Sequence, residues 1–343
     1  MFFLRPPSKS AEPPRKVYIE PTTRCNLNCS ICFRHGWTDE SPRDMENDVF
    51  CVLSSQLQGL DTVQEIFFGG MGEPLFHPKI TDMIGSLPQN KRISLLTNGT
   101  LLNYNMSRHL ITAGLNELWI SIDAFEKREY EQVQYGASFD KILSNLNVFN
   151  DARAGTKVKL GLTFVVTGAN VDQLAKINDF ADRFGVDELN VSLMIPQAAA
   201  TEEYLMYKNK RVTTGRMLRY KSTAETNEEY VCPFIASSSV FVRVDGCIAP
   251  CMQLLHSCHT YLFEEKRDIQ SFTYGNIKEK TLIDCWNSED YSNFRRRVDT
   301  FYFPFCRVCW GCEDRKKNLS DCILNDAPTC GACLWASGKV FCP

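Results

Sequence analysis

Short apolar segments alternate with helix-like segments from residue 16 to residue 219, and this rhythm constrains the fold more than any other feature. The apolar segments are rich in β-branched and aromatic residues and cover 16–22, 65–70, 93–99, 117–123, 157–166 and 188–195. Helical patterns lie between them at 46–58, 78–87, 103–113, 139–154 and 171–184, and we expect a sixth helix within 202–219. The alternation predicts parallel strands that are buried on both faces.

Units of one strand and one helix connect by right-handed crossovers. We therefore predict an α/β fold, a partial (β/α)6 barrel of the TIM type, whose chemistry sits at the carboxyl ends of the strands. Gly114, Gly155 and Gly185 follow three of the helical patterns and are typical of helix C-terminal caps. An open dinucleotide-binding sheet is the alternative, but no G-x-G-x-x-G follows the first strand.

Composition indicates an ordinary soluble protein. The chain of 343 residues is 44% hydrophobic and 23% charged, with a net charge of −3, which favours neither nucleic-acid binding nor membrane-surface binding. No segment reaches the roughly 18 apolar residues of a membrane helix. Residues 1–15 resemble a loose proline-rich arm more than a secretory signal. We therefore predict a cytoplasmic protein.

Cysteine is unusually frequent, with 16 residues in the chain. Most of them lie from Cys232 onward, where the strand–helix rhythm stops. This change divides the chain into an arm (1–15), a barrel (16–219), a polar linker (220–231) and a cysteine-rich extension (232–343). Cysteines spaced by two residues in a chain of this size favour metal binding over disulfides.

Three cysteines follow the first predicted strand closely. Cys25, Cys29 and Cys32 have the spacing C-x3-C-x2-C, and no fourth cysteine is near them. A [4Fe–4S] cluster normally takes four thiolates. Three ligands would leave one iron open to a substrate or a cofactor. A zinc knuckle is the alternative, because zinc also binds closely spaced thiolates.

A glycine-rich segment, F-F-G-G-M-G-E-P, follows the second strand at 67–74. Glycines let the backbone approach a ligand closely, and Glu73 can accept charge-assisted hydrogen bonds from an ammonium group. Together with the cysteine spacing, this segment resembles the radical S-adenosylmethionine superfamily. There the open iron chelates the amino and carboxylate groups of S-adenosylmethionine. The resemblance implies that Gly70, Gly72 and Glu73 bind the methionine part of that cofactor.

Polar residues end the following strands as well. Asn98 ends the third strand, and Ser121 and Asp123 lie on one face at the end of the fourth. The resemblance implies that these three contact the ribose or the carboxylate of the cofactor, with Thr163 on the fifth strand and Met194 on the sixth beside it. An ordinary core position is the alternative for Thr163 and Met194, and a turn is the alternative for Asn98.

The resemblance implies reductive cleavage of the cofactor. An electron passes from the cluster to the sulfonium, a C–S bond breaks, and a 5′-deoxyadenosyl radical abstracts hydrogen from the substrate. The protein supplies position and excludes water. A reduced ferredoxin or flavodoxin is implied as the electron donor. One departure is Ile31, at a position before the third cysteine that is often aromatic in the superfamily.

The extension resembles the SPASM extension of radical enzymes that modify peptides and proteins. Cys232 is followed after thirteen residues by Gly246 and after four more by Cys251, and 306–312 reads C-x2-C-x2-C. The usual C-x2-C-x5-C-x3-C is not present in that form. The resemblance implies one or two auxiliary [4Fe–4S] clusters. Their candidate ligands are Cys232, Cys251, Cys306, Cys309, Cys312, Cys322, Cys330, Cys333 and Cys342.

The other cysteines of the chain have no such pattern. Cys51 and Cys285 are expected to be isolated core thiols, and the roles of Cys247 and Cys258 stay open. Structural zinc is the alternative for the extension, and two histidines beside Cys258 keep it open.

The subgroup that fits best comprises maturases of tungsten-cofactor oxidoreductases. It shares loops like 29–34 and 69–74 and an ending like 330–343. The resemblance implies an enzyme that acts on a tungsten- or molybdenum-pterin oxidoreductase or on its cofactor. One alternative is a radical peptide maturase that forms thioether or carbon–carbon crosslinks. Another is a non-catalytic iron–sulfur carrier or scaffold, which predicts clusters with four ligands and no cofactor pocket.

Overall fold

The computed structural model describes residues 12–38, 41–197, 217–219, 230–262, 265–306, 309, 311–325 and 330–343. Within these residues the strands form a nine-stranded sheet and a two-stranded one. The large sheet contains β1 (Lys16–Ile19), β2 (Glu65–Phe68), β3 (Arg92–Thr97), β4 (Glu117–Ser121), β5 (Lys159–Val166), β6 (Glu188–Leu193), β7 (Met217–Arg219), β8 (Ser239–Val242) and β9 (Ile248–Ala249). The small sheet pairs β10 (Cys258–Leu262) with β11 (Glu265–Ile269) in antiparallel register.

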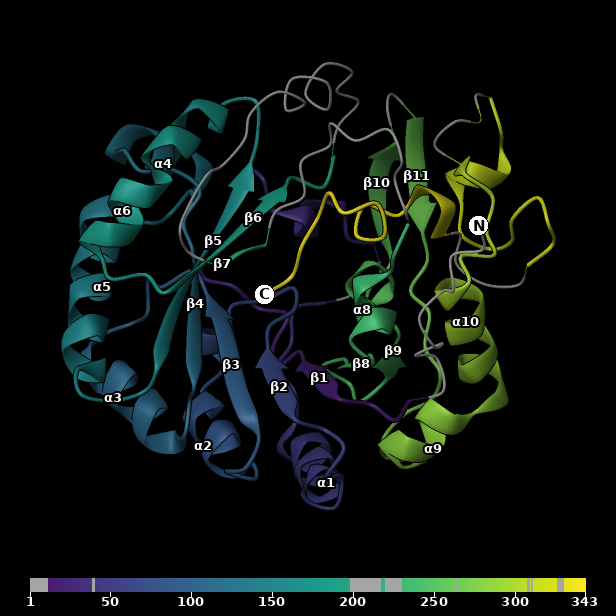
Figure 1. Ribbon diagram of the computed structural model, residues 1–343, viewed down its shortest axis with the longest axis horizontal. Coiled ribbons are helices and arrows are strands. Elements are labelled where there is room, and N and C mark those ends of the chain that lie inside the picture. The colour runs from purple at the N-terminus through teal and green to yellow at the C-terminus, as the bar shows by residue number, and fades with distance from the viewer. Residues whose placement is uncertain are drawn as a thin grey trace, which may run out of the picture.

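The large sheet runs in the order β7-β6-β5-β4-β3-β2-β1-β8-β9. Every neighbouring pair is parallel except β8 and β9. Among the described residues no pairing joins β7 to β9, so the curved sheet stays open, as in a partial barrel (Figure 1). The predicted α/β partial barrel is confirmed, and three strands extend it beyond six: β7 beside β6, and β8 and β9 of the cysteine-rich region beside β1.

The helices cover the outer face of the curved sheet and one flank of the molecule (Figure 1). They are α1 (Asn47–Gln58), α2 (Ile80–Gly85), α3 (Tyr104–Ala113), α4 (Lys127–Val133), α5 (Phe139–Arg153), α6 (Ile177–Arg183), α8 (Pro233–Ala236), α9 (Leu282–Asn287) and α10 (Glu289–Asp299). The predicted helix at 171–184 divides into a 3-10 turn and α6. The sixth predicted helix is wrong at 217–219, which form β7, and its earlier part lies outside the described residues.

Local sequence explains where the helices begin and end. The side chain of Asn103 accepts a hydrogen bond from the Met106 amide and so caps the start of α3. Gly114 ends the same helix with a φ of 105°, a left-handed conformation that suits glycine. Gly155 and Gly185 also have positive φ, in agreement with the predicted caps.

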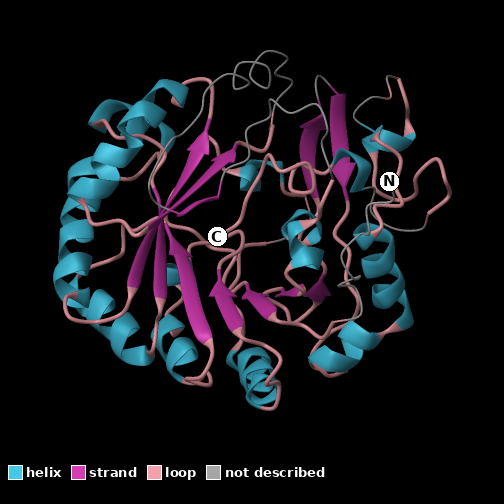
Figure 2. Cartoon of the chain, viewed as in Figure 1, coloured by secondary structure: helices cyan, strands magenta, loops and turns pink. Residues whose placement is uncertain are grey.

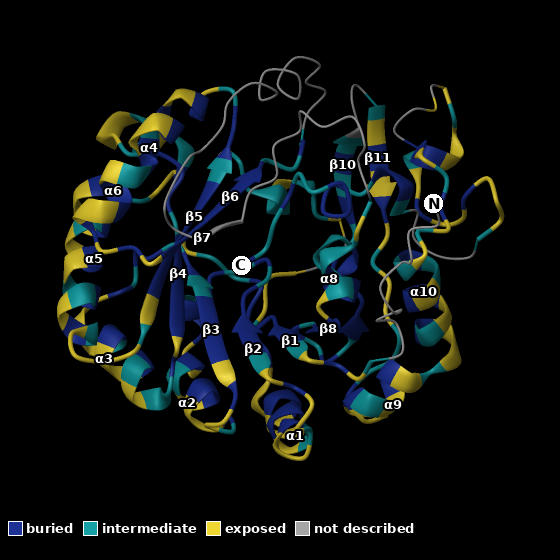
Figure 3. Cartoon of the chain, in the orientation of Figure 1, coloured by how far each residue is buried: buried dark blue, intermediate teal, exposed yellow. Residues whose placement is uncertain are grey.

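The strands of the large sheet are mostly buried (Figure 3), and alternate residues belong to two different cores. Val17 and Ile19 of β1 face the outer core beneath the helices, whereas Tyr18 belongs to an inner, aromatic cluster. Tyr18 stacks on Phe241 of β8 with ring centroids 4.3 Å apart. Trp119 of β4 lies over Gly161, where an added Cβ would come within 2.3 Å of the indole. Parallel strands with both faces buried are therefore observed as predicted.

The segment 334–343 fills the concave side of the sheet, where the C-terminus lies in Figure 2. Leu334 and Trp335 pack in the inner cluster. The main-chain oxygen of Pro343 accepts a hydrogen bond from Lys16 Nζ at 2.9 Å, and the Leu193 amide donates to the Lys339 oxygen at 2.9 Å. The segment thus connects β1 to β6 across the opening of the barrel.

The predicted division of the chain stays a prediction. Residues 1–11 and 220–229 lie outside the described part, so neither the arm nor the linker is defined by it. None of the described helices is both long enough and apolar enough to cross a membrane.

Candidate active site

The three-cysteine loop begins at the carboxyl end of β1. Its backbone is fastened to the end of α4, because the amides of Asn28 and Ser30 donate to the oxygens of Tyr135 and Val133 at 3.1 and 2.8 Å. A turn in which the Cys32 amide donates to the Cys29 oxygen at 3.1 Å closes the loop. All three thiols are partly buried.

The electrostatics of this loop fit an iron–sulfur cluster. Burial raises the pKa of all three thiols, Cys25, Cys29 and Cys32. The pKa of Cys29 reaches about 12, because the charges of Cys32 and Asp123 raise it further. Such thiols ionise only when cations compensate them, as cluster irons would. Arg34 lies close enough to lower the pKa of Cys25 and Cys32, and its Nη1 is buried without a hydrogen-bond partner among the described residues. Cluster sulfide could accept that bond.

Glu73 ties the glycine-rich loop to the end of β3. Its carboxylate accepts hydrogen bonds from the Leu75 amide at 2.9 Å, the Thr97 hydroxyl at 2.6 Å and the Asn98 amide at 2.7 Å. The side chain is 2% exposed, and burial raises its pKa to about 7 although these bonds oppose the shift. The observed role of Glu73 is therefore to hold two loops together. Its predicted contact with an ammonium group stays a prediction.

The two predicted glycines pack against the segment that leads into the cysteine loop. A Cβ at Gly72 would lie 2.3 Å from the Thr22 oxygen and 2.6 Å from the Arg24 oxygen. Gly70 has a φ of 144°, and a Cβ there would lie 2.8 Å from the Glu20 side chain. Only glycine fits this close approach. Both glycines hold the loop 69–74 against the cysteine loop.

Asn98 reaches from the end of β3 to the cysteine loop. Its Nδ2 donates to the Asn26 side chain at 3.1 Å and lies 3.8 Å from the sulfur of Cys25. Its Oδ1 accepts from the amide and the hydroxyl of Thr100, at 2.9 and 2.7 Å. The turn interpretation of Asn98 and its placement beside the cluster loop are thus both observed.

The end of β4 lies beside the same cysteines. Asp123 is 3% exposed and accepts hydrogen bonds from the Val165 amide at 2.9 Å and Gln134 Nε2 at 3.1 Å. Burial raises the pKa of Asp123 to about 6, although its hydrogen bonds, including one from Ser121, lower that pKa. The structure therefore brings Ser121, Asp123 and Cys29 together.

Sequence reasoning missed Tyr130 because it missed α4. This tyrosine is fully buried, and its hydroxyl has no hydrogen-bond partner among the described residues. Burial raises its pKa, and the charges of Asp123 and Cys29 raise it further. An unsatisfied hydroxyl beside these groups is a candidate donor to a bound ligand. The seven-residue helix that carries it gave no clear periodicity.

The remaining predicted residues lie on β5 and β6. Thr163 is 6% exposed and pairs in register with Ser121. Met194 continues the ladder of β6, since its amide donates to the Val166 oxygen at 3.1 Å. Beside it a narrow cavity opens between the barrel and the cysteine-rich region. Its lining includes Phe33, Met71, Ile195, Cys258, Thr260 and Trp335.

A buried hydrogen bond between a histidine and a carboxylate joins the two halves next to this cavity. Glu20, at the end of β1, is 2% exposed and lies 2.8 Å from Nε2 of the fully buried His256. Glu20 also accepts hydrogen bonds from the amides of Met71 and Val244 at 3.1 and 3.3 Å. Sequence reasoning missed Glu20, although a carboxylate directly after a buried strand was a visible signal. His259 likewise faces a carboxylate, Asp268, at 2.6 Å.

Four cysteines from separate parts of the chain form a first auxiliary group, which comprises Cys232, Cys251, Cys330 and Cys333. Burial raises the pKa of Cys330 well above the usual range, and the other three thiols raise it further. Burial also raises the pKa of Cys232 to about 12, and the charge of Cys333 adds to that shift. Interactions of this kind require the four thiols to be neighbours.

A second auxiliary group comprises Cys306, Cys309, Cys312 and Cys322. Burial raises the pKa of Cys306 to about 11. The charge of Arg267 lowers this pKa, and the charges of the other three thiols raise it. Arg267 lies between the groups and interacts with Cys306 of one and Cys333 of the other. Its Nη2 is buried and has no hydrogen-bond partner among the described residues. It is a further residue that sequence reasoning missed.

The two histidines beside Cys258 bear on the zinc alternative for the cysteine-rich region. A four-iron cluster takes four thiolates, one on each iron, and each auxiliary group has four cysteines. Both histidines beside Cys258 are occupied by carboxylates, Glu20 and Asp268.

The other cysteines have varied surroundings. Cys342 accepts a hydrogen bond from Trp335 Nε1 at 3.4 Å and packs near the first auxiliary group, and its predicted ligand role stays a prediction. Cys247 accepts from Asn276 at 3.4 Å. Cys285 is fully buried, as expected. The expectation for Cys51 is wrong, because this residue is exposed on the solvent side of α1.

Comparison with family models identifies both halves of the chain. Residues 19–181 match the radical SAM superfamily, and residues 232–313 match an iron–sulfur cluster-binding domain. The first match covers the strands that carry the three-cysteine loop, Glu73 and Asp123. The second begins at Cys232.

Two curated relatives show different coverage. The chain is 30% identical, over 95% of its own length and 96% of the relative, to the tungsten-containing aldehyde ferredoxin oxidoreductase cofactor-modifying protein of Pyrococcus furiosus. It is 29% identical to a probable GTP 3′,8-cyclase of Methanosarcina mazei, but over only 47% of this chain and 49% of that protein. Of these two relatives, the first matches both halves.

Solved structures show the same fold. Native anSMEcpe with bound AdoMet superposes with a TM-score of 0.60 at 17% identity, covering 95% of each chain. Streptococcus suis SuiB bound to S-adenosylmethionine gives a TM-score of 0.61 at 17% identity, over 91% of this chain and 74% of that one. The three-cysteine loop, the two auxiliary groups and the full-length relative converge, and the chain belongs to the radical SAM superfamily as an enzyme with a C-terminal iron–sulfur cluster-binding domain.

Proposed function

We propose that this enzyme modifies the pterin-bound metal cofactor of a tungsten- or molybdenum-dependent oxidoreductase, or the oxidoreductase that carries it. The full-length match to a cofactor-modifying protein carries the proposal, because it spans both the barrel and the cysteine-rich region. A match confined to the barrel would support only shared chemistry.

The cluster and S-adenosylmethionine, when bound, supply reductive C–S cleavage and a 5′-deoxyadenosyl radical. Cys25, Cys29 and Cys32 would hold that cluster, and Arg34 would offset the charge of their thiolates. Asn98 and Asp123 lie beside the cysteines and would orient the cofactor. We further propose Gly70, Gly72, Glu73, Ser121, Thr163 and Met194 as the rest of the cofactor site.

The substrate would enter between the two halves. The narrow cavity there is lined mainly by apolar and sulfur-containing side chains, which exclude water from a reactive radical. The first auxiliary group lies behind Trp335, since Cys232, Cys251 and Cys333 pack against the same inner cluster. The cavity is about 10 Å³, room for about one water molecule, so it marks the seam between two metal sites and is not a preformed substrate pocket.

A peptide or protein substrate is the second candidate. The fold likeness to SuiB and anSMEcpe favours it, but identities of 16–18% show the fold alone. We propose a reduced ferredoxin or flavodoxin as the electron donor and the cytoplasm as the site of action.

The test uses the anaerobically reconstituted enzyme with dithionite and S-adenosylmethionine. Formation of 5′-deoxyadenosine would be measured alone, with a tungsten or molybdenum pterin cofactor, with the cofactor-loaded oxidoreductase, and with peptides of that oxidoreductase. We expect the pterin or the loaded oxidoreductase to stimulate formation of 5′-deoxyadenosine. Mass spectrometry should then show that the stimulating molecule itself has gained or lost mass. Stimulation by the peptides alone would overturn the proposal in favour of a peptide maturase.

The matched variants are the Cys25/Cys29/Cys32→Ala triple variant and Cys51→Ala. The triple variant should lose one cluster and all 5′-deoxyadenosine formation. Cys51→Ala removes an exposed thiol that belongs to none of the three cysteine groups, and it should change neither iron content nor activity. Equal loss in both variants would show that the assay responds to damage and not to the cluster.

A further inference from the structure

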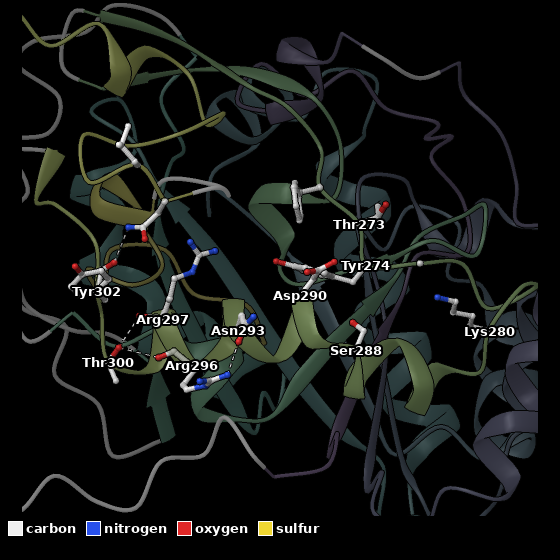
Figure 4. A pocket seen from close by; sticks show the side chains of 14 residues that line it. Thr273, Tyr274, Lys280, Ser288, Asp290, Asn293, Arg296, Arg297, Thr300 and Tyr302 are labelled. Carbon is white, nitrogen blue, oxygen red and sulfur yellow. Dashed lines mark hydrogen bonds between the residues drawn. The ribbon is translucent and has the colours of Figure 1, made fainter.

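A large groove opens on the flank of the molecule, away from the barrel. Its volume is about 920 Å³, and α10 forms one wall (Figure 4). Lys280 lies at one end, Tyr274 and Asp290 lie in the middle, and Arg297 and Tyr302 lie at the other end (Figure 4). No residue of this groove takes part in the cofactor site described above.

The charge of the groove is positive although the chain is acidic overall. Lys280, Arg296 and Arg297 line it, and Asp290 is the only acidic residue among the lining residues. Lys280 and Arg296 are exposed, whereas Arg297 is partly buried. The chain as a whole has a net charge of −3, so the groove is a local exception. Such a patch attracts a negatively charged surface.

Exposed apolar side chains form the far wall of the groove. Tyr302 is 57% exposed, and Leu324 is 85% exposed. Leu324 also has a φ of 63°, a left-handed conformation that costs free energy for a bulky residue. Asp321 holds this turn, since its side chain accepts from the amides of Ile323 and Asn325 at 2.8 and 3.1 Å. A strained turn thus exposes the side chain of Leu324 to solvent.

The floor of the groove adjoins the first auxiliary group. The Tyr274 amide donates to the Ile248 oxygen at 2.8 Å, and the Ile248 amide donates to the Gly275 oxygen at 2.8 Å, which places Tyr274 beside the strand that leads to Cys251. Burial raises the pKa of the Tyr274 phenol, and the charges of Cys330 and Cys251 contribute to the shift.

The far wall adjoins the second auxiliary group. Asn325 follows Cys322 by three residues, and its Nδ2 donates to the Tyr302 oxygen at 3.3 Å. Cys309 and Cys322 of this group are exposed. A cluster near the surface can exchange electrons with a docked protein, because electron tunnelling falls steeply with distance.

We propose that this groove is the docking surface for a small acidic protein that carries one electron, such as a reduced flavodoxin. Basic residues line the groove, exposed apolar ones form its far wall, and Tyr274 and Asn325 connect it to the two auxiliary groups. An iron–sulfur centre held by the cysteines of an auxiliary group would accept one electron, and the carrier would be oxidised by one electron, with no bond made or broken. This inference rests on the proposed function for its need of a donor and adds where the donor binds.

The first test is the Lys280→Glu/Arg296→Glu double variant with flavodoxin that a reductase and NADPH keep reduced. We expect the KM for flavodoxin in 5′-deoxyadenosine formation to rise about tenfold or more, and its salt dependence to flatten. The rate with dithionite should not change. The control is Arg128→Glu/Lys141→Glu on α4 and α5, which reverses two exposed charges across the molecule and should leave the KM unchanged.

The second test is Leu324→Asn. Asparagine tolerates the left-handed conformation better than leucine, so this variant should fold at least as stably. We expect its affinity for oxidised flavodoxin, measured by calorimetry, to fall severalfold although no charge has changed. An unchanged flavodoxin affinity in both variants would overturn the proposal.

Two further outcomes distinguish a docking surface from a small-anion site and from a failure of the proposed function. If inorganic phosphate stabilises the parent but not the double variant, while flavodoxin dependence is unchanged, the groove binds a small anion and the docking proposal fails. If the parent forms no 5′-deoxyadenosine with dithionite, the proposed function fails. Flavodoxin binding by calorimetry still decides the docking surface in that case.

Discussion

Carboxylates at the amino end of the parallel sheet form ion pairs, whereas Glu73 and Asp123 at its carboxyl end form none within the described part of the chain. At the amino end, the first residues of β1 to β6 alternate in charge, as Lys16, Glu65, Arg92, Glu117, Lys159 and Glu188. Ion pairs of 2.5, 2.8 and 2.8 Å join Arg92 to Glu65, Arg92 to Glu117 and Lys159 to Glu188. These charges are paired and contribute to stability.

At the carboxyl end, Glu73 and Asp123 are buried and form no ion pair with any described residue. Hydrogen bonds from neutral groups hold them, and burial raises the pKa of both, to about 7 and about 6. Unpaired acids of this kind suit a site that receives a cationic ligand. One sheet therefore keeps stability at one end and chemistry at the other, as expected for β/α barrels.

The largest expected effect is on the pH dependence of stability. The pKa of Glu73 rises from 4.5 to about 7 on folding, and that of Asp123 rises from 3.8 to about 6. The folded state therefore binds protons more tightly than the unfolded state, and each group should cost about 3 kcal/mol as pH rises through its window. Thermal unfolding of the enzyme from about pH 4 to about pH 7, which runs from the unfolded to the folded pKa values of the two groups, measures this loss.

The Glu73→Gln variant sharpens that measurement. It cannot ionise at this position, so its stability should depend less on pH than that of the parent. The Glu117→Gln variant should lose a different dependence, on the acid side: Arg92 and Ser94 lower the folded pKa of Glu117 against burial, so the parent loses this contribution only as pH falls below about 4.5. Parallel pH profiles for the two variants would contradict the contrast between the two ends.

The second effect is on activity. Asp123→Asn keeps the size of the side chain but places an NH2 group opposite the Val165 amide or Gln134 Nε2, both of which donate. We expect 5′-deoxyadenosine formation to fall at least about 100-fold, because the cofactor pocket would shift. The assay would be done with dithionite and verified clusters. Activity close to that of the parent would remove Asp123 from the site.

The third effect is on stability at the amino end. Glu117→Gln loses the charge that accepts hydrogen bonds from Arg92, Ser94 and Trp119. We expect a cost of about 1.5–3 kcal/mol in the free energy of unfolding, with unchanged activity. Chemical denaturation and the dithionite assay check the two parts. A loss of activity without a loss of stability would show that chemistry extends to this end.

The smallest effect is at an exposed pair. Lys159 is 51% exposed at its side chain, and its bond to Glu188 is accessible to solvent and salt. Lys159→Met should cost less than about 1 kcal/mol and should leave activity unchanged. Denaturation at low and high salt would detect it. A cost of several kcal/mol would show that the charge ladder acts as one cooperative unit.

Sequence reasoning found the features that depend on local spacing. The six strands, most of their helices and the C-x3-C-x2-C loop each lie within a short segment, so periodicity and spacing suffice to predict them. It missed α4, whose seven residues are too few for a clear period, and it extended a helix into β7.

The candidate site shows the same limit. Three cysteines of the second auxiliary group, at 306–312, were visible as a motif, but Cys322 was not assigned to them. The first group collects Cys232, Cys251, Cys330 and Cys333 from distant segments. No spacing rule assigns those four to one cluster. Sequence reasoning missed three residues whose roles depend on packing. Tyr130 and Arg267 each bury a polar atom that has no partner among the described residues, and Glu20 pairs with a histidine far along the chain.

The segment that fills the barrel has a consequence for the order of assembly. Its hydrogen bonds to Lys16 and Tyr18 span 327 and 325 residues, so these contacts have a high loop-closure cost and form late in folding. Cys330 and Cys333 directly precede the segment. Binding of a cluster by the first auxiliary group would therefore hold residues 334–343 in place on the sheet, and these residues would stay loosely held until the cluster is bound. Proteolysis near residue 334 should then be fast in cluster-free protein and slow in loaded protein.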